Sequence, residues 1–559
     1  MRTIETSVLI LGGGPVGLAL ALDLASRGQR CVLVEQVANQ PVLHPRAGGL
    51  AARTMEFCRR WGIDGDVKAC GFPRDREMDV VFCTTLSGHT LGRQKIAALG
   101  EREVLPFSPE IRERCPQIWF DPILARAVAR HPEHVTALYQ HTLLAFEQTE
   151  TEVVAEVRDD RSGELLRVVA PYFVAADGND SPVRQALGVG VEGEPVLSYS
   201  VNAILRSPEL NARNPQGEGA RYLFIGPNGT WSNMTVINGT DLWRITLIGK
   251  DSKMDLASVD MADVVRRAWG TDQIPFEILT VAPWRRKELN ATHYQVGRVF
   301  LAGDAAHAMS PTGGMGMNTG MGDAVDLGWK LTAMLQGWGG AALMDSYEVE
   351  RRPVGGRNAR WSSGNFKNWK SNAAWPELLD DTPAGAQCRA EVGRNLVDSL
   401  RDEWLSWGIQ LGYRYEGSPL IVPDGTPEPP DPPGEYEQTA RPGARAPHAW
   451  VAPGRSTIDW YGRGFVLLDF GAPAGHAAQL QSAARSRGVP LEVIHPDAAE
   501  VAQLYERKLV LVRPDGHVAW RADALDTDAL DLVDTVRGAR PVAPAKSTFP
   551  RGRLTLAPP

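Results

Sequence analysis

The stretch that decides the fold of this chain is residues 8–35, VLILGGGPVGLALALDLASRGQRCVLVE. Val8–Leu11 is a continuous apolar run, which is typical of a buried parallel strand. Three glycines follow, then a run of strong helix formers that ends near Gly28. A second apolar run, Cys31–Val34, closes at Glu35. This order predicts a βαβ unit.

The three glycines, at positions 12, 14 and 17, form the pattern Gly-x-Gly-x-x-Gly. The first permits a tight turn, the second lets the backbone approach a pyrophosphate, and the third lets the helix pack against the strand. Glu35 lies 18 residues after the last glycine, close to the spacing at which a carboxylate binds a ribose hydroxyl. Pro15 stands inside the turn, and the helix that follows would direct its N–H groups at phosphate. We therefore expect a dinucleotide site, which this pattern alone does not assign to FAD or NAD.

Size and composition exclude several classes of protein. A chain of 559 residues contains more than one domain, and its net charge of -8 without a basic stripe argues against nucleic-acid binding. No apolar run reaches the length of a membrane span. The six cysteines are scattered without metal-ligand spacing, so we expect no metal site and a reducing, cytoplasmic location.

The middle of the chain changes character. Strand-like runs at 222–225, 231–237 and 242–248 are separated by Pro-Asn-Gly and Asn-Gly-Thr-Asp, which are hairpin signals. We expect an antiparallel sheet domain at 74–100 and 188–290, inserted in a discontinuous nucleotide-binding domain at 1–73, 101–187 and 291–365.

The C-terminal part reads as a separate module. A helical segment is expected at 366–422, and six prolines within 423–433 predict a stiff linker at 423–435. The strands and helices expected at 436–545 follow a thioredoxin-like order. No cysteine lies beyond Cys388, so disulfide exchange is excluded and a structural or oligomer-stabilising role is favoured.

A second motif gives the chain a family resemblance. Residues 298–307 read RVFLAGDAAH, residues 311–320 read PTGGMGMNTG, and residues 323–331 read DAVDLGWKL. Together with the Asp-Gly-x-x-Ser-x-x-Arg pattern at 177–184, this sequence resembles the class A flavoprotein monooxygenases, the family of para-hydroxybenzoate hydroxylase and phenol hydroxylase. The resemblance covers about residues 4–360, and the tail resembles that of the larger phenolic hydroxylases.

The resemblance implies a mixed α/β fold and an FAD site. The fold is an FAD-binding Rossmann-type domain of the para-hydroxybenzoate hydroxylase type, with an inserted antiparallel-sheet substrate domain and a C-terminal thioredoxin-like domain. Asp304 would accept a ribityl hydroxyl, and the helix after the glycine-rich segment would stabilise negative charge at flavin N1–C2. The implied cofactor-binding residues are Gly12, Gly14, Pro15, Gly17, Glu35, Arg46, Gln117, Asp177, Gly303, Asp304, Pro311, Gly314, Gly316, Met317 and Asn318.

The same resemblance implies a mechanism. NADH or NADPH reduces the flavin without a Rossmann domain of its own, O2 adds at flavin C4a as a hydroperoxide, and an OH group passes to a small phenolic or aromatic substrate. Phenol hydroxylases carry an acidic residue where Gly48 stands here, so their substrate-deprotonating carboxylate is not carried over.

The substrate side of the site is expected to involve a few residues of the sheet domain and of the glycine-rich segment. Pro311, Tyr222 and Arg285 are the candidate catalytic residues. Tyr222, Trp231 and Trp284 are candidates for the pocket wall, and Arg221 or Arg285 could hold an anionic substrate. The expected assembly is a homo-oligomer, a dimer or larger.

Three other functions stay open at this point. A Baeyer–Villiger monooxygenase on the same scaffold would insert oxygen next to the carbonyl of an aromatic or polyketide-like ketone. A flavin dehydrogenase or oxidase would release peroxide without an oxygenated product. A non-catalytic flavin-bound partner protein would not be reduced by any nicotinamide donor.

Overall fold

A six-stranded sheet forms the centre of the nucleotide-binding half. The computed structural model describes residues 1–39, 47–249, 252–255, 258–369, 374–540 and 552–556. The strand order is β18-β19-β12-β2-β3-β8. The bounds are Gln295–Val296 for β18, Val299–Leu301 for β19, Tyr172–Ala175 for β12, Val8–Leu11 for β2, Cys31–Glu35 for β3 and Val135–Tyr139 for β8. All neighbours from β19 to β8 pair in parallel, so their carboxyl ends meet at one edge.

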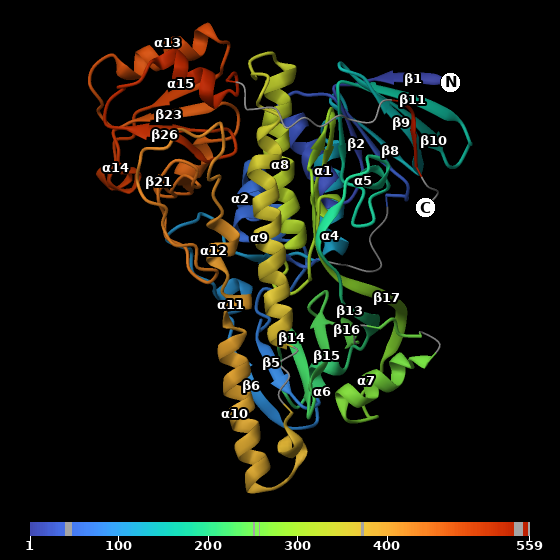
Figure 1. Ribbon diagram of the computed structural model, residues 1–559. Coiled ribbons are helices and arrows are strands. Elements are labelled where there is room, and N and C mark those ends of the chain that lie inside the picture. Colours follow the sequence, from blue (N-terminus) through green and yellow to red (C-terminus); the bar gives the residue numbers. More distant parts are fainter. Residues whose placement is uncertain (40–46, 250–251, 256–257, 370–373, 541–551, 557–559) are drawn as a thin grey trace.

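Four helices pack around this sheet. They are α1 (Pro15–Ser26), α4 (Gln117–Ala129), α8 (Gly316–Leu335) and α9 (Ser346–Trp369). Helix α1 is buried from Gly17 to Ala25, which explains why its sequence is apolar on all sides. Figure 1 shows α8 and α9 running through the middle of the molecule. A five-stranded sheet flanks this region, with β1 (Arg2–Glu5), β11 (Leu165–Ala170), β10 (Val153–Asp159), β9 (His141–Gln148) and β27 (Leu554–Thr555).

The inserted sheet has eight strands, in the order β20-β17-β13-β16-β15-β14-β5-β6. Their bounds are His307–Ala308, Glu277–Ala291, Val191–Arg206, Leu242–Ile248, Gly229–Val236, Arg221–Gly226, Val80–Cys83 and Thr90–Gln94. The predicted antiparallel meander is confirmed, because β14, β15 and β16 pair as successive antiparallel neighbours. Strand β5 joins β14 in parallel, so a segment from the first hundred residues completes this sheet. Helix α7 (Met261–Trp269) and the sheet share an apolar core.

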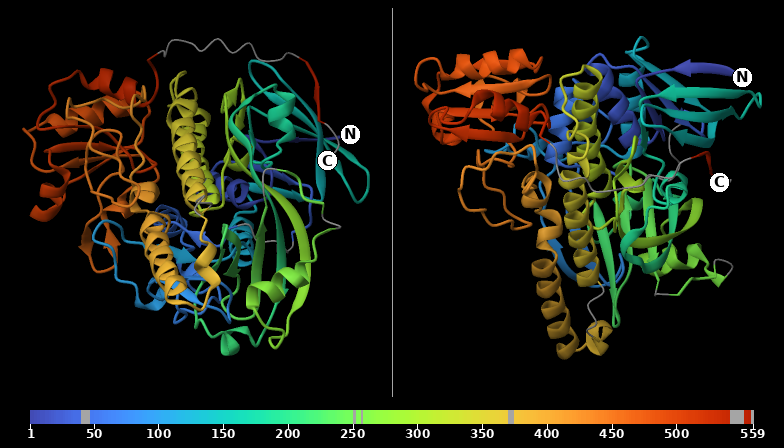
Figure 2. Two further views of the ribbon diagram at one scale, coloured as in Figure 1. Left: turned by 60° about the horizontal axis from the view of Figure 1, so that its bottom comes forward. Right: turned by 45° about the horizontal axis from the view of Figure 1, so that its top comes forward.

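The C-terminal module contains the elements that its sequence predicts. A four-stranded sheet has the order β24-β23-β25-β26, with β23 at Phe465–Asp469, β24 at Leu491–Ile494, β25 at Leu509–Val512 and β26 at Val518–Ala522. Helices α13 (His476–Ser486), α14 (Ala499–Tyr505) and α15 (Ala529–Val536) accompany it. The module packs against α8, where Trp329 contacts Phe465 edge to face at 6.1 Å. Figure 2 shows it beside α8 and α9 in both views.

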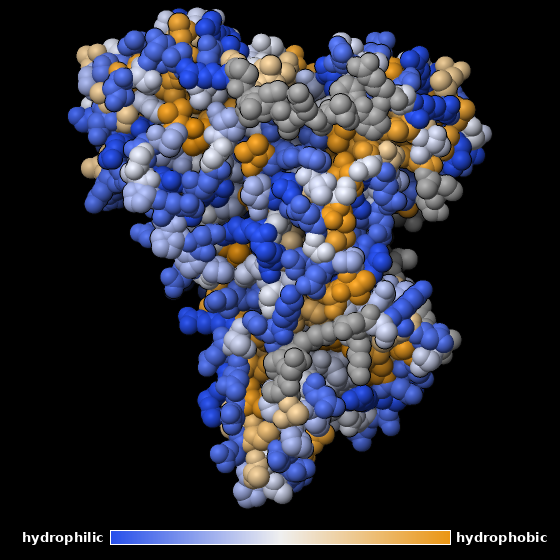
Figure 3. Space-filling model, in the orientation of Figure 1, coloured by the Kyte–Doolittle hydropathy of each residue, from blue (hydrophilic) through white to orange (hydrophobic). Residues whose placement is uncertain are grey.

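Shorter elements connect these parts. They are β4 (Gly49–Leu50), α2 (Ala52–Arg60), α3 (Asp64–Lys68), β7 (Glu113–Arg114), α5 (Pro182–Ala186), α6 (Leu210–Arg213), α10 (Pro383–Ser399), α11 (Arg401–Trp404), α12 (Trp407–Leu411), β21 (Trp450–Ala452) and β22 (Arg455–Ser456). Among the described residues, no helix combines the length and the apolar character that crossing a membrane requires. The face in Figure 3 is mostly hydrophilic, with hydrophobic patches interrupted by polar residues.

Candidate active site

The two glycine-bearing motifs meet at the carboxyl edge of the six-stranded sheet. Gly12 follows β2 with φ of 108°, and a Cβ added there would lie 2.3 Å from the carbonyl oxygen of Ala176, just after β12. A Cβ added at Gly303, just after β19, would lie 2.9 Å from Val16 Cγ2. Segments almost three hundred residues apart therefore contact each other in one crevice. Parallel open sheets bind nucleotides at this edge.

The start of α1 is built to receive an anion. Gly14 is its N-cap and Pro15 its first residue, and no described side chain caps this end. A Cβ added at Gly14 would meet nothing within 4 Å, whereas one added at Gly17 would lie 1.9 Å from the carbonyl oxygen of Gly12. Gly14 thus faces open space, and Gly17 brings the helix onto the turn. Uncapped N–H groups next to open space suit a pyrophosphate.

Acidic side chains border this crevice. Glu35 accepts hydrogen bonds from the backbone N–H groups of Gly13 at 2.6 Å and Val37 at 2.9 Å, which fix its carboxylate at the end of β3. Asp177 accepts from the Val183 N–H at 3.2 Å through Oδ2, while its buried Oδ1 has no hydrogen-bond partner among the described residues. Burial raises the pKa of Asp177. An unsatisfied buried acceptor beside a dinucleotide crevice fits a ligand that brings a hydroxyl donor.

Asp304 and the start of α8 lie side by side. Asp304 belongs to the short turn Gly303–Ala305, and a Cβ added at Gly316, the first residue of α8, would lie 3.9 Å from its Oδ1. Met317 packs partly against the core, and within the described part of the chain no side chain caps this helix. The turn is fixed from behind, because Asp323 accepts from the Gly303 N–H at 3.0 Å and contacts His307 Nε2 at 2.7 Å. His307 therefore helps to hold this turn in place.

The side chain of Asn318 connects the two loops around the site. Its Oδ1 accepts from the Ala51 N–H at 2.8 Å and the Thr54 hydroxyl at 2.7 Å. Its Nδ2 donates to the carbonyl oxygens of Gly49 at 3.1 Å and Gly314 at 2.7 Å. With these bonds the carboxamide is fully used. We therefore expect only the backbone of Asn318 to contact the cofactor. Its side chain holds the two loops in position.

A pocket opens beside these loops. One side is formed by backbone of the glycine-rich segments and by Pro311. The opposite side comes from β14, β15 and β16 of the inserted sheet and from Trp404 of α11. The lining residues are Ala47, Gly48, Gly49, Arg112, Arg114, Pro116, Arg221, Thr235, Val236, Ile237, Arg244, Pro311, Gly313, Gly314 and Trp404. Gln117, at the start of α4, borders it by donating its N–H to the carbonyl of Ala47 at 3.1 Å.

The charge of this pocket is strongly positive. Four of the residues that line it are arginines, and no aspartate or glutamate lines it among the residues that the structure describes. Burial and the neighbouring arginines lower the pKa of Arg114 to about 9 and that of Arg244 to about 10, so both stay charged at neutral pH. The buried carboxylate of Glu403 lies 3.4 Å from the Arg221 guanidinium. It accepts hydrogen bonds from Trp369 Nε1 at 2.7 Å and from the Gly313 N–H at 3.2 Å. Burial raises its pKa.

Two of the predicted wall residues lie on the other face of the sheet. Tyr222 is fully buried, donates its hydroxyl to the carbonyl of Gly217 at 2.7 Å and packs against Trp243. Trp231 packs against Phe224, with the Arg267 guanidinium 4.1 Å from its ring. Neither residue is in the lining of this pocket, and on β14 it is Arg221 that faces the pocket, because neighbouring side chains point to opposite faces of a strand.

Strand β17 shows the same alternation. Arg285 is 43% exposed, lies 3.7 Å from Asp180 and is not among the residues that line the pocket. Arg286 points inward and donates to the hydroxyls of Ser310 at 2.8 Å and Thr312 at 2.9 Å, on either side of Pro311. Trp284 lies 4.8 Å from this guanidinium, outside the pocket lining. It therefore supports the Pro311 loop through Arg286.

The remaining candidates divide as follows. Arg221 and Pro311 line the pocket, as the sequence led us to expect. Arg46 lies outside the described residues. Sequence reasoning missed Arg112, Arg114, Arg244 and Trp404. The first two carried one usable signal, since their spacing of two puts them on the same side of an extended segment.

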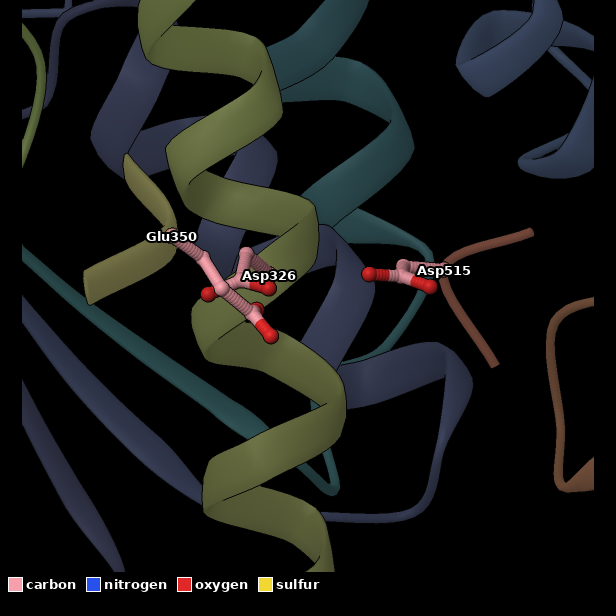
Figure 4. A group of neighbouring side chains, drawn as sticks. All are labelled: Asp326, Glu350 and Asp515. Atoms are coloured by element: carbon pink, nitrogen blue, oxygen red, sulfur yellow. The ribbon is translucent and has the colours of Figure 1, made fainter. Parts of the chain in front are cut away.

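A group of buried carboxylates near the C-terminal module is an ion-pair network rather than a metal site. Figure 4 shows Asp326 of α8 and Glu350 of α9 facing Asp515, which precedes β26. Lys330 Nζ lies 2.7 Å from both Asp326 and Glu350, and Arg513 pairs with Glu350 and Asp515. Lys330 and Arg513 thus offset the charge of these carboxylates, and the network joins the module to α8 and α9.

Comparison with known proteins agrees with this geometry. Residues 5–362 match the family model "FAD binding domain", and residues 439–539 match "Aromatic-ring hydroxylase, C-terminal". A putative polyketide hydroxylase of Streptomyces halstedii is 32% identical, covering 92% of this chain and 93% of the relative. A 2,4-dichlorophenol 6-monooxygenase of Delftia acidovorans is 31% identical over 93% and 95% of the two chains. Chromopyrrolic acid-soaked RebC with bound 7-carboxy-K252c superimposes with a TM-score of 0.90 and 40% identity over 96% of this chain and 100% of that chain.

Proposed function

Since this chain belongs to the FAD-dependent aromatic-ring hydroxylases, we propose that it is a monooxygenase that hydroxylates an aromatic substrate held in the pocket beside Pro311, with NADH or NADPH as electron donor and O2 as co-substrate. The observation that carries this proposal is the composition of the pocket wall. One side is formed by loops next to the dinucleotide crevice and the other by the inserted sheet. A substrate bound there would lie against the reactive part of the cofactor.

The residues of the crevice fit an FAD. The uncapped start of α1 and the open space at Gly14 suit its pyrophosphate, and Glu35 stands at the strand end where a ribose is bound. Asp304 and the start of α8 adjoin the pocket, where the ribityl chain and the flavin ring would follow. When bound, FAD supplies the oxygen-transfer chemistry, which no side chain can provide.

The protein's own groups hold the loops of the site in place, favour negative charge at the flavin ring and limit the entry of water. The N–H groups at the start of α8 favour negative charge on a reduced ring, because no side chain caps them. Asn318 and Arg286 hold the loops that carry Gly314 and Pro311. Val236, Ile237 and Pro116 make part of the wall apolar, which limits the entry of water to the reacting atoms.

The test is to supply purified yellow protein with NADH or NADPH and a panel of phenols and aromatic acids. We expect at least one compound to accelerate nicotinamide consumption together with oxygen, and to yield a product one oxygen atom heavier. NMR of that product separates a ring hydroxyl from an inserted ring or ester oxygen, which would identify a Baeyer–Villiger reaction. Peroxide without any oxygenated product across the panel would contradict the proposal in favour of an oxidase.

A further inference from the structure

Glu403 is a buried carboxylate of the short helix α11, next to the wall residue Trp404. Its side chain is 0% exposed, and its two oxygen atoms contact three different elements. Oε1 accepts from the Gly313 N–H at 3.2 Å and lies 3.4 Å from the Arg221 guanidinium, and Oε2 accepts from Trp369 Nε1 at 2.7 Å. One carboxylate oxygen therefore connects the glycine-rich loop to the inserted sheet.

Two side chains hold the loop around Pro311 from behind. Arg286 of β17 donates to the hydroxyls on either side of the proline, at 2.8 and 2.9 Å. Glu403 accepts from the N–H of Gly313, two residues after the proline. Gly313 also lies against the Trp361 ring, because a Cβ added to it would be 2.3 Å from that ring. The backbone of this loop is therefore held by one cation and one anion.

Glu403 also brings negative charge to a group of buried arginines. Arg112 lies on the cofactor side, with its Nη2 3.7 Å from a Cβ added at Gly314. Burial lowers the pKa of Arg112 to about 10 and that of Arg286 to about 9, and it lowers the pKa of Arg221 as well. In all three cases the Glu403 carboxylate acts against burial and favours the charged guanidinium.

This charge bears on how easily a flavin beside the loop is reduced. Positive charge near a flavin favours its reduced form, which carries negative charge. The arginines favour that form, and Glu403 opposes it. Although burial raises the pKa of Glu403, Arg221, Arg112 and two N–H donors favour its ionised form. Because these groups are buried, salt and water screen their charges only weakly.

Resting on the proposed function, we propose that Glu403 is a positioning residue that holds the Gly313 N–H in place and, through its negative charge, sets how readily the flavin bound beside the Pro311 loop is reduced. Glu403 is not among the residues that line the pocket, so it acts through the loop and the arginines and not on the substrate itself. It also lies outside the ranges 5–362 and 439–539 that match the two family models.

The experiment measures the reduction potential of the flavin in the purified holoenzyme, without nicotinamide donor or substrate. Enzyme and a reference dye of known potential are reduced together, and absorbance gives the reduced fraction of each. Glu403→Gln removes the charge and keeps the size of the side chain, so it should shift the flavin–dye equilibrium towards reduced flavin by about tenfold. No shift, or a shift towards oxidised flavin, in a variant that retains FAD would overturn the inference.

Two control variants separate the charge from other effects of substitution. Trp369→Phe removes the hydrogen bond to Oε2 but keeps an aromatic ring and the Glu403 charge. Asp424→Asn removes a carboxylate that is 10% exposed and 2.7 Å from Arg521 Nε, in the C-terminal part of the chain. Both should leave the equilibrium within about twofold of the wild type. A tenfold shift in either control would contradict the inference, because it would assign the effect to lost contacts or to charge at any position.

A second comparison decides the matter if Glu403→Gln alone does not retain FAD. In an Arg221→Gln background the paired cation is already gone, so adding Glu403→Gln leaves no broken pair between these two residues. The double variant should still favour reduced flavin by about tenfold more than Arg221→Gln does. Equal potentials for these two proteins would overturn the inference.

The proposed function can fail separately from this inference. A shifted potential in Glu403→Gln, combined with no oxygenated product from any compound tested, would remove the monooxygenase activity and leave the role of Glu403 in place. A hydroxylated product from the wild type, combined with an unshifted potential in Glu403→Gln, would have the opposite meaning.

Discussion

Two glycines of the first turn differ in what they do, and substitution can separate the two tasks. Gly12 has a φ of 108°, and an added Cβ would lie 2.3 Å from the backbone of Ala176, so Gly12→Ala should destabilise the fold itself by about 3 kcal/mol. Gly14 has an ordinary extended backbone and open space around it, so Gly14→Ala should change the stability of the FAD-free protein by less than about 0.5 kcal/mol. We expect it instead to weaken FAD binding by about tenfold or more, through the methyl group at the pyrophosphate position.

Thermal unfolding of the FAD-stripped variants and titration with FAD check this pair. If Gly14→Ala bound FAD as the wild type does, the crevice would not be the pyrophosphate site. The sequence distinguishes these glycines only by their order in the motif. The physical reason for the difference, the approach of Ala176 to Gly12, depends on a strand that follows 160 residues later and pairs directly with β2.

The structure departs most from the sequence-based expectations in which face of strand β14 meets the pocket. Tyr222 was expected to contact substrate, but β14 turns it into the core and presents Arg221 to the pocket. Alternation predicts that these neighbours point to opposite faces. It does not predict which face meets the cofactor, because that depends on how the whole sheet is placed against the glycine-rich loop. The wall residue Trp404 was missed for a related reason, since its short helix has no recognisable motif and becomes part of the site only by tertiary packing.

The new position of Tyr222 leads to a prediction about β14. Tyr222→Phe removes a buried hydrogen bond to the carbonyl of Gly217 and leaves that acceptor without this partner, so the variant should lose about 1 kcal/mol of stability. Because the hydroxyl lies outside the pocket, kcat and KM for any accepted substrate should stay within about twofold of the wild type. Denaturant unfolding and steady-state kinetics measure the two effects. A large fall in kcat with unchanged stability would instead support the catalytic role that the sequence predicts for Tyr222.

At the scale of the whole molecule, buried ion pairs tie the C-terminal module to the nucleotide-binding half. Glu56 of α2 is paired with Arg445, which precedes the module's first long strand, and with Arg53 at 2.7 Å. Glu350 of α9 is paired with Arg513, which follows β25. The elements of the module follow from local patterns in the sequence. This docking does not, because it joins residues more than 160 positions apart and each partner resembles an ordinary surface charge until the fold buries both.

These pairs predict an acid-sensitive junction. Burial alone would raise the pKa of Glu56, but Arg445 and Arg53 outweigh burial and lower its pKa from the usual 4.5 to about 2. The folded state therefore binds the proton less readily than the unfolded chain does. The stabilisation is complete above about pH 4.5 and is lost as the pH falls towards 2, with a contribution of about 3 kcal/mol from this group.

Glu56→Gln tests this contribution, because it leaves Arg445 and Arg53 as buried cations without their carboxylate. At pH 7 the variant should be less stable by about 3–5 kcal/mol, and its stability should fall less steeply than that of the wild type between pH 4.5 and 2. Glu194→Gln is the matched control, since Glu194 is 54% exposed and 3.3 Å from Lys367, and it should change stability by less than about 1 kcal/mol. Urea unfolding at a series of pH values gives both slopes. Equal slopes for Glu56→Gln and the wild type below pH 4.5 would mean that the junction is held by apolar packing of Trp329 and Phe465 and not by its charges.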